Sequence, residues 1–193
     1  RAVAWRGAGA DMGVASLRNP VNLAVATWSW GNYYGDAKMK GAKLDVAKWQ
    51  RPDPKTAPFE AKAAGLYMIA TMSKHTAEAN GCSDAMMMDY RGYVAEATGA
   101  NIFFVKDGEV HTPTPDAFLN GLTRQTVIEM LTKMGVKVHE RHILPGELED
   151  FSQCWLTGSA AEITPVGQIG NYNFEVGELT QAVSKNYEQL VRE

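Results

Sequence analysis

Residues 85–112 read AMMMDYRGYVAEATGANIFFVKDGEVHT, and this stretch decides the fold class. The pairs Arg91–Gly92 and Asp107–Gly108 favour tight hairpin turns between short apolar runs. Those runs predict four short strands, at residues 85–88, 93–95, 102–105 and 110–112. We therefore expect an antiparallel sheet in this part of the chain.

Helical patterns precede and follow this stretch in the sequence. Apolar and small residues recur at helical spacing from Leu66 onward, and Gly81 stands where a C-terminal cap belongs. A second periodic segment, 123–134, stops at Gly135, and residues 176–191 predict a terminal helix. Strands followed by helices in this way indicate an α+β fold.

The N-terminal part of the chain has a different pattern. Residues 23–30 form an apolar, aromatic-rich run that suits a strand leading into a turn. Residues 38–58 are charged and hold three prolines, which favours extended connections over a helix. A domain boundary is expected near residues 30–40.

The composition excludes several classes of protein. The chain has 193 residues, of which 45% are hydrophobic and 21% charged, and its net charge is -3. This balance describes one or two ordinary soluble domains. Without a basic cluster or a long apolar run, we expect neither nucleic acid nor membrane as a partner. Cys82 and Cys154 have no metal-ligand or disulfide spacing, so we expect no metal and a cytoplasmic location.

Lys62 is an unusual lysine, because its neighbours Ala61, Ala63, Ala64 and Gly65 cannot pair with an ammonium group. Desolvation among small apolar residues would favour a neutral amine, which is the nucleophile that forms a Schiff base with a carbonyl group. A lysine that extends from the first turn of a helix into water is the alternative explanation.

Three further segments could serve the same chemistry. Gly121 and Thr123 begin a strong helix, where free backbone amides favour a phosphate, although Thr123 could be an ordinary cap. Ser159 lies in a small-residue turn after an apolar run and could help bind a second anion, or simply end a strand. Glu96 stands near a strand end among small residues and could otherwise be an exposed loop acid. Two anion sites, a lysine and an acid are the groups that pyridoxal phosphate catalysis needs.

Four ordered blocks carry a resemblance to a known family. They are AKAAGLY at 61–67, EATGANIF at 96–103, LNGLTR at 119–124 and LTGSAAEITP at 156–165. With these blocks the chain resembles the branched-chain amino acid aminotransferases, which are class IV pyridoxal phosphate enzymes of fold type IV. The resemblance implies a large domain with an antiparallel sheet or pseudo-barrel and flanking helices, together with the tail of a smaller α/β N-terminal domain.

The resemblance also implies a role for each site residue. Lys62 would form the Schiff base and move the proton, while Tyr67 and Glu96 would contact the phenolic oxygen and the ring nitrogen of the cofactor. The other implied cofactor contacts are Gly99 and Leu119 at the ring faces and Leu122, Thr123 and Ser159 at the phosphate. The implied substrate contacts are Ser159 and Ala160 at the carboxylate and Trp30 and Tyr33 at the side chain.

The implied reaction moves an amino group between L-leucine, isoleucine or valine and 2-oxoglutarate. A D-amino acid aminotransferase or an aminodeoxychorismate lyase of the same fold is the alternative, and the stretch from Trp30 to Tyr33 favours the branched-chain interpretation. We expect residues 1–29 to be the tail of the small domain, 30–40 a linker and 41–193 the large domain. The chain starts at Arg1 and lacks the early part of the small domain, so we expect a fragment that is weakly active or inactive alone. The family assembles as homodimers or hexamers.

Overall fold

The computed structural model describes residues 1–9, 13–29 and 40–192, and it divides the chain into two compact units, Arg1–Gly31 and Asn32–Glu193. The candidate substrate residues Trp30 and Tyr33 lie outside the described residues, so their predicted roles stay predictions.

The first unit contains an antiparallel hairpin of β1 (Ala2–Arg6) and β2 (Val21–Val25). The predicted strand at 23–30 overlaps β2, but β2 begins two residues earlier and ends at Val25. Pro20 lies directly before it and its carbonyl accepts a hydrogen bond from the Gly7 amide, which closes the pair at that end. Both faces of this hairpin expose large apolar side chains, namely Val3, Trp5, Val21, Leu23 and Val25.

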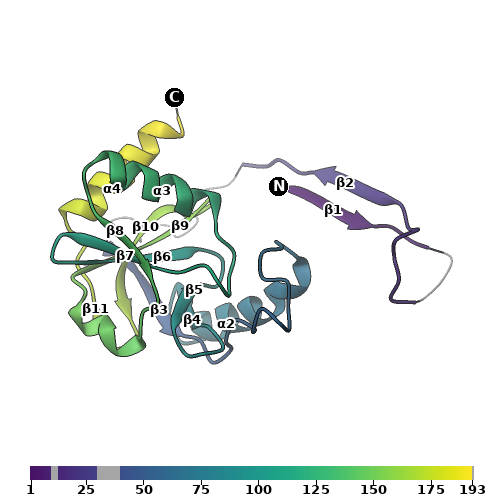
Figure 1. Ribbon diagram of the computed structural model, residues 1–193, viewed down its shortest axis with the longest axis horizontal. Coiled ribbons are helices and arrows are strands. Elements are labelled where there is room, and N and C mark those ends of the chain that lie inside the picture. Colours follow the sequence, from purple (N-terminus) through teal and green to yellow (C-terminus); the bar gives the residue numbers. More distant parts are fainter. Residues whose placement is uncertain (10–12, 30–39, 193) are drawn as a thin grey trace. The chain divides into compact units, whose positions relative to one another are not determined.

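In the second unit nine strands of the described residues form one mixed sheet (Figure 1). The strand order is β5-β4-β3-β10-β9-β6-β7-β8, with β11 paired to β10. The strands are β3 (Ala42–Val46), β4 (Asp84–Met88), β5 (Val94–Ala97), β6 (Asn101–Lys106), β7 (Glu109–Pro113), β8 (Val138–Arg141), β9 (Gln153–Gly158), β10 (Glu162–Ile169) and β11 (Tyr172–Asn173).

The two predicted hairpins are present. β4 pairs antiparallel with β5 and β6 pairs antiparallel with β7. Asp107 and Gly108 both have positive φ, 53° and 78°, as a two-residue hairpin turn of this kind requires. The antiparallel expectation does not extend to the whole sheet, because β3 runs parallel to β4 and β10, and β7 runs parallel to β8.

The sheet is curled. β5 and β6 are consecutive in the chain and only residues 98–100 connect them, yet the two strands lie far apart in the strand order. Such a short connection can join them only if the sheet bends until these strands approach each other. The result is the half-barrel with flanking helices that the α+β prediction describes.

Three α-helices of the described residues cover the outer face of this sheet. α2 (Tyr67–Ala79) buries Ala70, Ser73 and Ala77, and it ends near Gly81, whose φ of 73° fits the predicted cap. The others are α3 (Leu122–Lys133), followed by Gly135 with positive φ, and α4 (Glu178–Leu190). Figure 1 shows α3 and α4 together and α2 beside β4. Short 3₁₀ turns are η1 (Ala64–Leu66) and η2 (Pro145–Asp150). No helix in the described part of the chain has the length and apolarity to cross a membrane.

Side chains alternate between two faces along the central strands. Ile102 and Leu156 belong to the core on one face of the sheet, whereas Phe103 and Trp155 pack with residues of α3 and α4 on the other. Asn101 and Thr157 face each other across the β6–β9 ladder. By the same alternation, both side chains project on the side of Phe103 and Trp155, toward α3.

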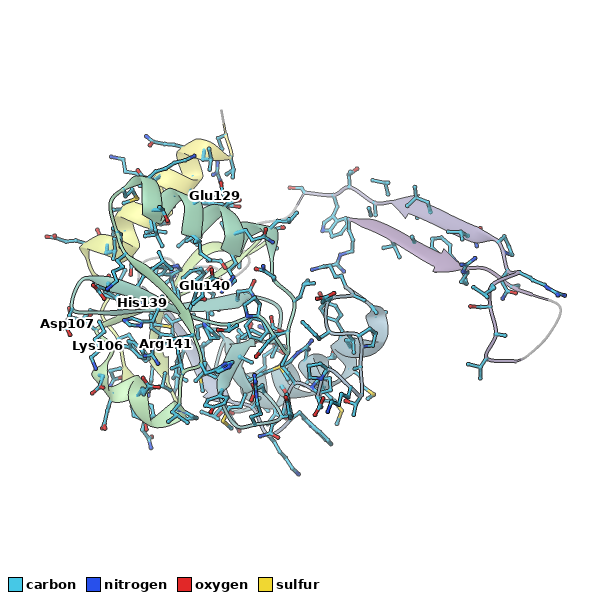
Figure 2. All side chains as sticks on the ribbon, in the orientation of Figure 1. Lys106, Asp107, Glu129, His139, Glu140 and Arg141 are labelled. Atoms are coloured by element: carbon cyan, nitrogen blue, oxygen red, sulfur yellow. The ribbon has the colours of Figure 1, made fainter. Side chains whose placement is uncertain are left out.

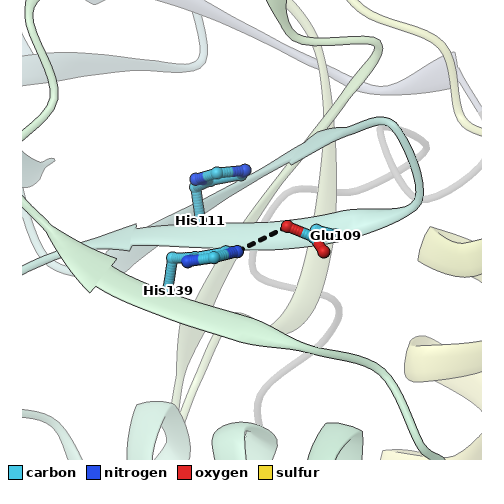
Figure 3. A group of neighbouring side chains, drawn as sticks. All are labelled: Glu109, His111 and His139. Atoms are coloured by element: carbon cyan, nitrogen blue, oxygen red, sulfur yellow. Dashed lines mark hydrogen bonds and ion pairs between the residues drawn. The ribbon is translucent and has the colours of Figure 1, made fainter.

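One face of the β7–β8 ladder carries a cluster of charged and imidazole side chains (Figure 3). The rings of His111 and His139 stack with centroids 4.7 Å apart, and His139 Nε2 lies 2.6 Å from Glu109 Oε2. Arg141, labelled beside His139 in Figure 2, donates from Nε to His111 Nδ1 at 3.1 Å. Burial and the Arg141 charge lower the pKa of His111. These contacts join the side chains of β7 and β8 to one another on this face of the ladder.

Candidate active site

Glu96 is a buried acid on β5 with two protein partners. The Arg51 Nε atom lies 3.3 Å from Glu96 Oε1, and Asn101 Nδ2 donates to Glu96 Oε2 at 3.3 Å. Burial raises the pKa of Glu96 to about 7, against the charges of Arg51 and Lys62, which lower it. The alternative of an exposed loop acid is therefore wrong, and although its neighbours in the sequence are small, the fold gives this carboxylate two partners.

Arg51 was not expected from the sequence. It follows β3 in the extended segment, where its backbone amide bonds to Met88 O at 2.8 Å, and the residue is buried. Its Nη1 atom also donates to Leu66 O at 3.4 Å, four residues after Lys62. No local pattern marks an arginine that pairs with an acid 45 positions later. The arginine thus links the Lys62 segment to Glu96.

Lys62 lies in the segment that leads into α2, and Tyr67 is the first residue of that helix. The Lys62 Nζ atom is 5.8 Å from the centroid of the Tyr67 ring, and both residues are exposed. The desolvation that we expected around Lys62 is absent, because its small neighbours Ala61, Ala64 and Gly65 are exposed as well. Lys62 is nevertheless close enough to Glu96 for its charge to act on that carboxyl group.

The N-terminus of α3 presents free backbone amides. Gly121 is the N-cap residue, no side chain caps the helix, and Leu122 is 79% exposed. Thr123 is buried, and its hydroxyl lies 3.4 Å from the Tyr187 hydroxyl of α4 instead of capping the helix. Tyr187 is a neighbour of this site that the sequence did not indicate. Uncapped amides at the positive end of a helix of 12 residues attract an anion.

Asn101 joins the Glu96 region to the turn before α3. Besides its bond to Glu96, Asn101 Nδ2 donates to Leu119 O at 3.0 Å, and the Gly121 amide donates to Asn101 Oδ1 at 3.2 Å. A Cβ on Gly121 would lie 2.4 Å from Asn101 Oδ1, so this approach needs a glycine. One side chain therefore connects Glu96, which we assigned to the ring nitrogen, with the turn just before the residues Leu122 and Thr123 that we assigned to the phosphate.

The turn between β9 and β10 lies beside the turn between β5 and β6. Ser159 and Ala160 are exposed in the first turn, and Gly99 is exposed in the second. A Cβ on Gly158 would be 3.6 Å from the Gly99 carbonyl, which shows how closely the turns approach. The hydroxyl of Thr157, one residue earlier, is buried without a hydrogen-bond partner in the described structure.

The structure thus gathers most of the predicted residues at one end of the sheet. Glu96, Gly99 and the 119–123 segment meet through Asn101 and the adjoining turns. The segment just before Lys62 and the segment around Leu119 line one groove. Its lining residues are Phe59, Glu60, Pro115, Leu119 and Asn120. Such a site offers an amine, an acid and an anion-binding helix end within one region.

The raised pKa of Glu96 predicts a pH-dependent stability. A carboxyl group whose pKa rises from 4.5 in the unfolded chain to about 7 binds its proton more tightly in the folded state. Its contribution to stability is complete below pH 4.5 and is lost as the pH rises to 7, which amounts to about 3 kcal/mol. Urea unfolding of the wild type and of Glu96→Gln at both pH values measures this difference.

Glu149→Gln is the matched control for the loss of one acid, because Glu149 is exposed and lies outside this groove. Equal pH dependence of the wild type and Glu96→Gln would contradict the assignment of a perturbed Glu96.

Comparisons with known proteins agree with this geometry. A family model described as amino-transferase class IV matches residues 1–169. A probable branched-chain-amino-acid aminotransferase of Rickettsia felis is 40% identical over 158 residues, which is 80% of this chain and 54% of that protein. The branched-chain-amino-acid aminotransferase of Pseudomonas aeruginosa is 34% identical over 93% of this chain and 60% of its own length.

Solved structures show the same similarity. The branched-chain aminotransferase of Thermoproteus uzoniensis with norvaline matches with a TM-score of 0.92 and 31% identity, over 98% of this chain and 63% of that one. An aminotransferase of Brucella abortus bound to the cofactor PLP matches with a TM-score of 0.84 and 28% identity, over 100% of this chain and 68% of that one. This chain spans little more than half the length of the curated relatives that it matches. The family match, the relatives and the shared half-barrel together show that this chain belongs to the class IV aminotransferases.

Proposed function

We propose that the chain is the pyridoxal phosphate-binding part of a transaminase that moves the amino group between L-leucine, isoleucine or valine and 2-oxoglutarate. The observation that carries the proposal is the buried Glu96, which Arg51 and Asn101 hold beside the free amides of α3. The relatives named branched-chain aminotransferases support this choice of substrates.

The residues present fit the cofactor. A phosphate ester suits the uncapped start of α3, where Gly121 lies too close to Asn101 for any larger residue. A ring nitrogen suits Glu96, because burial raises the pKa of this acid to about 7 in spite of Arg51, and a protonated nitrogen would add a second positive charge that stabilises the carboxylate. The buried Thr157 hydroxyl, next to the Ser159 turn, is a polar group that still lacks a partner.

When bound, pyridoxal phosphate supplies an electron sink that stabilises negative charge on the substrate α-carbon. The Glu96 carboxylate would accept a hydrogen bond from the ring nitrogen and keep it protonated. The Lys62 amine would hold the cofactor and move the proton at the α-carbon, and Tyr67 would donate to the phenolic oxygen. The amides of Leu122 and Thr123, the Thr123 hydroxyl and Ser159 would bind the phosphate.

The remaining contacts orient the substrate. Leu119 and Gly99 would contact the two faces of the ring, and the amides of Ser159 and Ala160 would bind the substrate carboxylate. The proposal also assigns the substrate side chain to Trp30 and Tyr33, which lie outside the described residues. Because one methylene is worth only about 1 to 3 kcal/mol in such a pocket, the enzyme accepts leucine, isoleucine and valine with overlapping preference.

The proposal includes the organisation of the whole protein. Residues 1–29 are the tail of a small domain, 30–40 a linker and 41–193 the large domain. The protein assembles as a homo-oligomer in the cytoplasm, and the free thiols of Cys82 and Cys154 are consistent with a reducing compartment.

A visible absorption spectrum of the protein with pyridoxal phosphate, before and after addition of L-leucine, tests this function. We expect a visible band from the lysine-bound cofactor, and we expect L-leucine to convert it to a band at shorter wavelength as the amino group is transferred. D-Leucine is the matched control and should leave the spectrum unchanged. A response to D-leucine alone would favour a D-amino acid aminotransferase, and bound cofactor with no response to either would favour a binding scaffold without turnover.

A further inference from the structure

Asn101 uses every polar atom of its side chain within the site. The side chain is buried, and its amide nitrogen donates one hydrogen bond to Glu96 Oε2 and another to Leu119 O. Its carbonyl oxygen accepts the Gly121 amide. An asparagine amide offers two donor hydrogens and an oxygen with two lone pairs, so the three partners use both donors and one of the two lone pairs.

The partners also fix which way the amide points. Glu96 Oε2 and Leu119 O are both acceptors when Glu96 is ionised, so the NH₂ group must face them. Only the opposite side, where the Gly121 amide donates, can receive the carbonyl oxygen. A rotated amide would place three oxygens against one another, and this orientation is therefore the stable one.

The backbone of Asn101 is held independently of its side chain. The residue begins β6 and pairs with Thr157 across the β6–β9 ladder. By contrast, Glu96 comes from β5 and Gly121 precedes α3, so two separate segments converge on one fixed point of the sheet.

We propose that Asn101 is a positioning residue that couples the acid Glu96 to the turn before α3, so that the ring-nitrogen partner and the phosphate-binding amides are set at one separation. The ligand side of this inference rests on the proposed function. Because the pyridine ring is rigid, the distance between its nitrogen and its phosphate-bearing carbon cannot adapt. A binding site for this ring therefore benefits from a single side chain that fixes both contacts relative to each other.

The first test uses the cofactor-free protein and the variants Asn101→Ala and Gly121→Ala. Asn101→Ala removes a donor from Glu96, and its charged neighbours Arg51 and Lys62 remain. We expect Glu96 to titrate at higher pH, measured from the pH dependence of unfolding, and the Gly121 amide to exchange its hydrogen about 10-fold faster or more. Gly121→Ala changes only the residue that bonds to the carbonyl oxygen of Asn101. It should nevertheless move the Glu96 titration, because the new Cβ would lie 2.4 Å from Asn101 Oδ1 and displace the side chain.

Asn80→Ala is the matched control, since Asn80 Nδ2 also donates to a carboxylate, Asp45 Oδ2 at 2.8 Å, but on an exposed surface. It should leave the Glu96 titration and the Gly121 exchange as in the wild type. A residue with a merely structural role would lower the stability without moving the Glu96 titration in either variant, and that result would overturn the coupling. If Asn101→Ala does not fold, the Glu96 titration in Gly121→Ala alone distinguishes coupling from a merely structural role.

The second test separates this inference from the proposed function. With pyridoxal phosphate, Asn101→Ala should bind the cofactor about 10-fold more weakly and slow the proton transfer about 10- to 100-fold, as expected for a lost hydrogen bond to a charged group. A wild type that binds no pyridoxal phosphate would refute the proposed function, while the cofactor-free measurements still decide whether Asn101 couples Glu96 to Gly121. An Asn101→Ala variant with an altered Glu96 titration but unchanged cofactor binding and rate would show that the coupling operates only in the cofactor-free protein. That result would overturn the role of Asn101 toward the cofactor.

Discussion

Replacing Lys62 with alanine is expected to abolish transamination and to remove the cofactor that borohydride reduction fixes to the chain. Lys62 is the only amine of the AKAAGLY segment, and its charge reaches the buried Glu96. The lost proton transfer alone should slow the reaction about 10²- to 10⁴-fold, and loss of the covalent attachment adds to this. Mass spectrometry after reduction locates the attached cofactor, and amino-acid turnover in the protein measures the rate.

Lys55→Ala is the matched control, because Lys55 is an exposed lysine in the preceding turn. It should keep both the attachment and the turnover. Turnover retained by Lys62→Ala, or cofactor fixed to another lysine in the wild type, would rule out the role proposed for Lys62. The exposure of Lys62 makes the test sharp, since removing an exposed side chain should disturb the fold very little.

Replacing Glu96 with glutamine is expected to leave cofactor binding largely intact and to slow the proton-transfer step about 10²- to 10³-fold, the loss typical of one removed electrostatic contact. Glutamine keeps an acceptor for Asn101 but cannot keep the ring nitrogen protonated. Single-turnover kinetics with L-leucine separates the proton transfer from cofactor binding, which a titration measures.

The variant also leaves the Arg51 guanidinium buried without its counter-charge. We therefore expect a loss of stability on the order of 3 kcal/mol near neutral pH, reduced by the cost of ionising Glu96 itself. Glu149→Gln again serves as the control for the loss of an acid at an exposed position. A normal single-turnover rate in Glu96→Gln would show that this carboxylate does not support the electron sink.

Local signals made much of the fold predictable. Asp107–Gly108 marks a hairpin because its positive φ angles suit few other pairs, and Gly81 and Gly135 mark helix ends for the same reason. The parallel ladders of β3 with β4 and β10 were not predictable, because strand partners distant in the chain leave no local signal. Residues 42–46 instead have the charged, extended character that we assigned to a connection.

In the candidate site, too, the sequence marks some residues, and only the fold reveals the others. Glu96, Thr123 and Ser159 could be singled out because each lies in a segment whose small residues expose backbone amides or isolate a charge. Arg51, Asn101 and Tyr187 could not, because each acts through a partner brought near by the fold: Glu96, Gly121 and Thr123 respectively. The burial of Glu96 and the exposure of Lys62 likewise depend on packing, which the residue types around them do not determine.

The curled sheet has a consequence for folding. Glu96 and Asn101 are five positions apart in the sequence, but their strands occupy distant places in the strand order. Residues 98–100 alone connect the two strands, so these two side chains stay near each other in the chain. The Arg51 contact of Glu96 and the Gly121 contact of Asn101 instead join segments 45 and 20 positions apart, so the complete site forms through contacts of high sequence separation as the sheet assembles. A ligand that binds only this arrangement would stabilise the whole sheet by mass action. The cofactor would then select for completely folded chains, since only chains with a complete sheet could retain it.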